Sequence, residues 1–151
     1  MTRLRRRERA EGQALVEFAF ALIPFMFLLM GTIDLGRGIY MNNGVSQAAR
    51  EIARVISVHP CAGVCATGTY SPEAQAVINT QRALIPGLDE SGIVVDCVDL
   101  TNATVPAGEE GCPPNGSFVR VSVSATFMRI TPLLPLPNPY GLNAIAHVKV
   151  P

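Results

Sequence analysis

The cysteines are the residues of this chain with the clearest potential chemistry. The 151-residue sequence has four of them, Cys61, Cys65, Cys97 and Cys112. An even number in an oxidising compartment predicts two disulfides, for which three connectivities are possible. We expect Cys61–Cys65 and Cys97–Cys112, because each pair closes a local loop and thereby restricts the unfolded chain. A zinc site that includes His59 is the alternative, although Cys-x3-Cys differs from the usual zinc-knuckle spacing.

Little else in the sequence predicts catalysis. The two histidines are His59, which precedes a proline, and His147, which lies on the more polar face of an expected strand. A nucleophile elbow, a phosphate-binding loop and a paired-carboxylate motif are all absent. Twelve basic and twelve acidic residues give a net charge of zero, which argues against nucleic-acid binding. We therefore expect no enzymatic activity, no cofactor, no metal site and no small-molecule substrate.

One carboxylate, that of Glu17, borders the most apolar part of the chain. The run 18–33 between Glu17 and Asp34 is uncharged, and as a helix it would be about 24 Å long. Because the hydrocarbon core of a bilayer is about 30 Å thick, a span must also recruit residues 14–16 and bring Glu17 to its edge. An acid at that depth often marks function, although it could also extend to the interface. Pro24 predicts a kink there, either tolerated or used in packing.

The arginines predict the direction of this span. Five of them precede the apolar run and nothing comparable follows it: Arg3, Arg5, Arg6, Arg7 and Arg9. The positive-inside rule then places the N-terminus in the cytoplasm and the residues after Asp34 outside it. A cleaved secretory signal peptide is the alternative. No Ala-x-Ala-like site follows Met30, however, and the helical pattern continues past Asp34.

Beyond the span, apolar residues recur with helical spacing on a single face: Met41, Val45, Ala48, Ala49, Ile52, Ala53 and Ile56. We expect one helix over Ala14–Val58, ended by His59-Pro60. Ser71, Pro72 and Glu73 predict the start of a second helix, which ends before Pro86-Gly87. Its inward residues would be Ala74, Val77, Ile78 and Leu84.

Three strands are expected after the second helix, over 93–100, 117–129 and 142–150. The middle one alternates most clearly, with Val119, Val121, Val123, Ala125 and Phe127 on one face. The predicted fold class is α+β. A single N-terminal transmembrane helix continues into a long amphipathic helix, which packs on a small antiparallel β-sheet, as in a pilin.

The N-terminal third also resembles a known family. Gly12 and Gln13, followed by VEFAFALIPFMFLLMGTIDLGRGIY and QAAREIAR, resemble the TadE-like proteins of tight-adherence (Flp) pilus assembly. The residues that carry the resemblance are Gly12, Glu17, Phe18, Pro24, Gly31, Asp34, Gly36, Arg37, Ala48, Ala49, Arg50, Glu51, Ala53 and Arg54. The resemblance implies a prepilin peptidase cut between Gly12 and Gln13, and subunit assembly in the membrane through Glu17, Phe18 and Pro24.

The same resemblance suggests roles for the charged residues outside the membrane. Asp34 and Arg37 would make an assembly contact, although an (i, i+3) surface ion pair is the simpler interpretation. Arg50, Glu51 and Arg54 could equally form a solvated helix face. The expected organisation is a basic leader (1–12), a transmembrane helix (13–33), its extracytoplasmic extension (34–58) and a small α+β domain (59–151).

The resemblance implies a non-enzymatic minor pilin or pseudopilin of a tight-adherence pilus or secretion system. Its location would be the bacterial inner membrane or the pilus. Its partners would be the lipid bilayer, other pilin-like subunits and the inner-membrane assembly platform. The alternative is a stably anchored binding or scaffold protein that never enters a filament.

Overall fold

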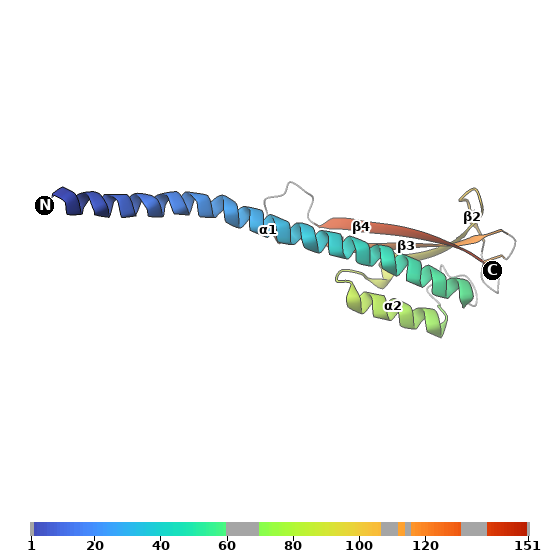
Figure 1. Cartoon of the computed structure of the whole chain (residues 1–151). Coiled ribbons are helices and arrows are strands. Elements are labelled where there is room, and N and C mark those ends of the chain that lie inside the picture. The colour runs from blue at the N-terminus through green and yellow to red at the C-terminus, as the bar shows by residue number, and fades with distance from the viewer. Residues whose placement is uncertain (1, 60–69, 107–111, 114–115, 131–138, 151) are drawn as a thin grey trace. The chain divides into compact units, whose positions relative to one another are not determined.

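The computed structural model describes residues 2–59, 70–106, 112–113, 116–130 and 139–150, and the side chains among them from Gly12 onward. Within these residues the elements follow the order α1 (Thr2–Val58), α2 (Pro72–Leu84), η2 (Glu90–Gly92), β1 (Ile93–Val98), β2 (Thr104–Val105), β3 (Phe118–Phe127) and β4 (Tyr140–Lys149) (Figure 1). A long apolar helix, a short helix and an antiparallel sheet confirm the α+β class. The chain divides into two compact units: Met1–Arg37 with Arg129–Leu136, and Gly38–Met128 with Pro137–Pro151.

Helix α1 is continuous from Thr2 to Val58. It ends where His59-Pro60 predicts, but it begins twelve residues before the predicted start at Ala14. Arginine, glutamate, alanine and leucine dominate residues 2–11, and all are strong helix formers. Gly12 costs about 1 kcal/mol relative to alanine, which is too little to interrupt a helix of this length. Pro24 also lies inside α1, which continues past it.

The core of the second unit forms where one face of α1 meets α2 and the sheet. All seven predicted positions of α1, from Met41 to Ile56, are buried in it. The sheet contributes the inward residues of β1, β3 and β4, among them Val95, Val121 and Ala146. The predicted amphipathic half of the long helix is therefore confirmed.

The sheet has the strand order β2-β1-β3-β4, with every neighbouring pair antiparallel. Val121 stands at its centre, opposite Val95 of β1 and Ala146 of β4. The predicted alternation of β3 is confirmed, because Val119, Val121, Val123 and Ala125 are buried. Strand β2 was not predicted; it pairs with β1 through Cys97↔Val105 and Val98↔Thr104.

Helix α2 begins as predicted, but its last residue, which was predicted to be buried, is exposed. The Ser71 hydroxyl accepts a hydrogen bond from the Ala74 N–H at 3.2 Å, and Ala74 and Ile78 are buried. The prediction for Leu84 is wrong, since 61% of it is exposed. Six residues after Ile78, Leu84 lies about 240° around the helix from it. Ile85, which follows the helix, is buried instead.

Candidate functional site

The apolar half of α1 has no protein cover among the described residues. Its large side chains are exposed on every side of the helix, including Leu15 at 70%, Phe18 at 62% and Phe20 at 74%. The most apolar window is entirely unburied, and the helix is long and apolar enough to cross a membrane. A helix that is apolar all round needs a lipid or protein environment.

Glu17 lies at the N-terminal border of this apolar surface and has a partner one turn before it. The Gln13 side-chain amide donates to Glu17 Oε1 at 3.1 Å. The two residues therefore share one face of α1, and the side-chain contact was not part of the sequence prediction. Cleavage after Gly12 would leave a main-chain ammonium on the same residue that donates this amide, so Gln13 would carry both donors.

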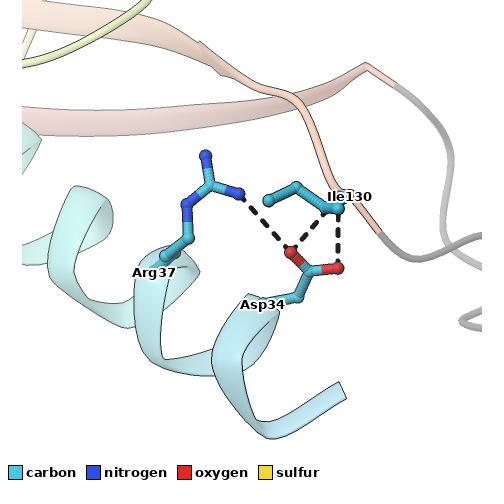
Figure 2. A network of polar contacts seen from close by, with 3 residues as sticks. All are labelled: Asp34, Arg37 and Ile130. Atoms are coloured by element: carbon cyan, nitrogen blue, oxygen red, sulfur yellow. Dashed lines mark hydrogen bonds and ion pairs between the residues drawn. The ribbon is translucent and has the colours of Figure 1, made fainter. Parts of the chain in front are cut away.

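Asp34 at the other border is buried, with only 3% of it exposed. The Ile130 N–H donates to both carboxylate oxygens, at 3.2 Å to Oδ1 and 3.1 Å to Oδ2 (Figure 2). Arg37 Nη1 lies 3.5 Å from Asp34 Oδ1, so the (i, i+3) ion pair is present as well. All three residues belong to the first compact unit.

The contact with Ile130 connects residues 96 positions apart in the sequence. A carboxylate removed from water without hydrogen-bond partners would be strongly unfavourable. A hydrogen bond to a charged group contributes about 1.5–3 kcal/mol of net stability. Asp34 therefore fixes the main chain just after β3 against α1, one residue beyond the apolar run.

Apart from Gly12 and Gly31, the remaining positions of the family pattern outside the membrane helix fall into two groups. Ala48, Ala49 and Ala53 are at most 1% exposed and pack in the core of the second unit. Gly36, Arg50, Glu51 and Arg54 are exposed. Among the described residues, a Cβ at Gly36 would meet nothing within 4 Å, so their packing does not require glycine there. These exposed positions form the part of the pattern that is available to a partner.

One of the two expected disulfides is confirmed. Cys97 and Cys112 are bonded, with their Cα atoms 5.4 Å apart. The bond joins β1 to the chain that follows β2, and it takes two of the four cysteines that a zinc site could have used. The expected Cys61–Cys65 bond lies outside the described residues.

Two carboxylates near this disulfide have structural partners. Asp96 Oδ2 accepts from Arg120 Nη2 at 2.8 Å across the β1–β3 pair. Asp99 Oδ1 accepts from the Thr101 hydroxyl at 2.6 Å, the Thr101 N–H at 2.8 Å and the Ala103 N–H at 3.0 Å. These hydrogen bonds, chiefly the one from the Thr101 hydroxyl, hold the pKa of Asp99 below its ordinary value. Asp99 therefore organises the β1–β2 turn.

Tyr70 and His147 are two further titratable residues of the second unit. Burial raises the pKa of the Tyr70 hydroxyl, and the charge of Glu90 adds to this effect. His147 is exposed on β4, as expected. Among the described residues, no three His, Cys, Asp or Glu side chains lie close enough together to hold a metal ion.

Comparison with known families supports the resemblance of the N-terminal third. Residues 12–54 match the family model described as TadE-like protein. We call this segment TadE-like because of its similarity to that family. It lies entirely within α1 and covers the Glu17 border, the apolar run, Asp34 and most of the buried stripe of the second unit. Searches of curated proteins and of solved structures gave no significant match.

The TadE-like segment indicates a role in the assembly of a Tad/Flp-type pilus, and its apolar helix indicates membrane anchoring. The match ends before α2 and the sheet. The match therefore carries no information on residues 55–151.

Proposed function

We propose that the protein is a minor pilin or pseudopilin that takes part in assembling a tight-adherence pilus or secretion system. Its N-terminus would lie in the cytoplasm, α1 would span the inner membrane, and the α+β unit would lie outside. The observation that carries the proposal is the TadE-like helix itself. One half is apolar with no protein cover among the described residues, and the same helix continues into a folded unit.

Glu17 is the residue that would make assembly specific. Lateral contacts between apolar helices in lipid lack a hydrophobic driving force, because lipid tails are as apolar as leucine. A carboxylate at the edge of the hydrocarbon would select a neighbour that offers a cation at the same depth. Cleavage after Gly12 would create such a cation on Gln13 of the next subunit, one turn from that subunit's own Glu17. Low dielectric would strengthen this pairing.

The protein would be a structural component, not an enzyme. Its working parts would be the membrane helix and the exposed positions Gly36, Arg50, Glu51 and Arg54, which would contact other subunits or the assembly platform. In the sheet unit the carboxylates Asp96 and Asp99 are engaged in hydrogen bonds within the fold.

Glu17→Ala tests the proposal. The substitution removes a charge from the membrane edge, so insertion should be unimpaired or easier. Removing one member of a buried charge pair costs about 3–5 kcal/mol, and about 1.4 kcal/mol already reduces association tenfold. Pilus assembly, or co-purification with pilin-like subunits, should therefore fall severalfold. Asp89→Ala is the matched control, since Asp89 is exposed and makes no side-chain cap hydrogen bond.

Normal assembly by a Glu17→Ala protein that is cleaved and present at its usual level would refute the pilin-like mechanism. An anchored scaffold would then be the better interpretation. N-terminal mass spectrometry of membrane-extracted protein tests the leader separately. Mature protein should begin at Gln13, and intact residues 1–12 on most molecules in cells with an active prepilin peptidase would contradict the cleavage prediction.

A further inference from the structure

Asp34 places an exposed apolar residue at the edge of the membrane helix. It is the first charged residue after the apolar run, so in a membrane-spanning α1 it marks the outer boundary of the span. Its carboxylate holds the Ile130 N–H at 3.1–3.2 Å (Figure 2). Ile130 must therefore lie at the depth of Asp34, and 70% of it is exposed.

The apolar surface of α1 continues on both sides of Asp34. Ile33 and Leu35, which flank Asp34 in sequence, are exposed at 52% and 62%. The Asp34 charge lies between these apolar residues. The bifurcated hydrogen bond from the Ile130 N–H and the ion pair with Arg37 offset the cost of removing it from water.

The sequence that follows Ile130 has the same character. Residues 131–138 lie outside the described part of the chain; their sequence contains Leu133, Leu134 and Leu136 and no charged side chain. The sequence is therefore uncharged from Ile130 to Tyr140.

We propose that Ile130, held by Asp34, is a second membrane contact of this protein, inserted at the outer interface of the bilayer beside α1. The partner is the lipid surface itself. The inference rests on the proposed membrane span of α1 but not on pilus assembly. Its outcome is therefore independent of the Glu17→Ala assay.

The chain contains no tryptophan, so a single introduced tryptophan reports on one position. Full-length Ile130→Trp protein would be reconstituted into phosphatidylcholine vesicles with and without lipids brominated near the headgroup. Leu100→Trp is the matched control, because Leu100 is 81% exposed and belongs to the compact unit that does not contain Ile130. Phe25→Trp reports on the span itself.

Ile130→Trp fluorescence should be quenched severalfold more strongly than that of Leu100→Trp, and deeply brominated lipids should quench Phe25→Trp. Adding Asp34→Ala to Ile130→Trp should lower its quenching toward the Leu100→Trp level and leave Phe25→Trp unchanged. Equal quenching at positions 130 and 100 would overturn the proposal. Quenching of Ile130→Trp that survives the added Asp34→Ala would overturn the role of Asp34, and an unquenched Phe25→Trp would remove the span on which the inference depends.

Discussion

The two halves of α1 are parts of one continuous helix but bury their apolar residues in different ways. From Phe18 to Ile33 the large side chains are apolar and exposed on all sides. From Met41 to Ile56 only one face is apolar, and it includes three alanines that are at most 1% exposed. A lipid environment requires apolarity without periodicity, whereas a protein core requires periodicity and side chains of the right volume. Tolerance to substitution should therefore differ sharply along a single helix.

The largest expected effect is the difference in unfolding free energy between the same substitution, isoleucine to alanine, in the two halves of α1. Ile52 is fully buried, and Ile52→Ala should lower the free energy of unfolding of the α+β unit by about 2–5 kcal/mol. Ile33 is 52% exposed, and Ile33→Ala should leave that free energy almost unchanged. Denaturant unfolding of the two detergent-solubilised variants measures both. Similar losses would show that the two halves are not separately stabilised.

The disulfide should stabilise the α+β unit, into which the second half of α1 packs, and should not affect the apolar half. Cys97 and Cys112 are 15 residues apart, and closing a loop of this length restricts the unfolded chain by about 3 kcal/mol. Replacing both by serine should lower the free energy of unfolding by about that amount. The apolar half should keep its membrane insertion. A double variant as stable as the native protein would contradict the prediction.

Asp34 lies between the two halves, and its removal should loosen one point of the chain. Asp34→Ala removes the acceptor of the Ile130 N–H, and a hydrogen bond to a charged group contributes about 1.5–3 kcal/mol. Amide hydrogen exchange at Ile130 should therefore accelerate about tenfold or more. The amide of Val121, at the centre of the sheet, should exchange at its native rate. Unchanged exchange at Ile130 would refute the assigned contact.

The smallest expected effect is the contribution of Asp99, outside α1, to the pH dependence of stability. The folded state lowers the pKa of Asp99, so its ionised form is favoured by folding. Its contribution to stability is present above the ordinary aspartate pKa and is lost as the pH falls through the folded-state value. An NMR titration should give a midpoint below that of an unperturbed aspartate, and Asp99→Asn should weaken the acid sensitivity. A midpoint at or above the ordinary value would contradict this.

Local patterns predicted most of the fold, and contacts between distant residues account for what was missed. The end of α1 at Val58 and the Ser71 cap follow from neighbouring residues, so both could be read from the sequence. Strand β2 has two residues, and only its pairing with Cys97 and Val98 makes it a strand.

The candidate site shows the same limit. The pair formed by Asp34 and Arg37 could be predicted from its (i, i+3) spacing. The Asp34–Ile130 contact joins residues 96 apart, and the only signal for it was an acid directly after an apolar run. Leu84 was wrongly assigned to the core because the helical spacing of α2 was assumed to continue to its last residue. The next residue, Ile85, fills that part of the core instead.

The order of the strands has a consequence for the time course of synthesis. The apolar face of α1 is complete once Ile56 has been made, but β3 and β4, which help to cover it, come last. Roughly sixty residues separate Ile56 from Phe118, which corresponds to several seconds of translation. A chain interrupted before Phe118 would keep Val45, Ile52 and Ile56 without the sheet that buries them. Incomplete chains would thus expose an apolar helix face that proteases and chaperones can recognise, whereas the complete chain buries it.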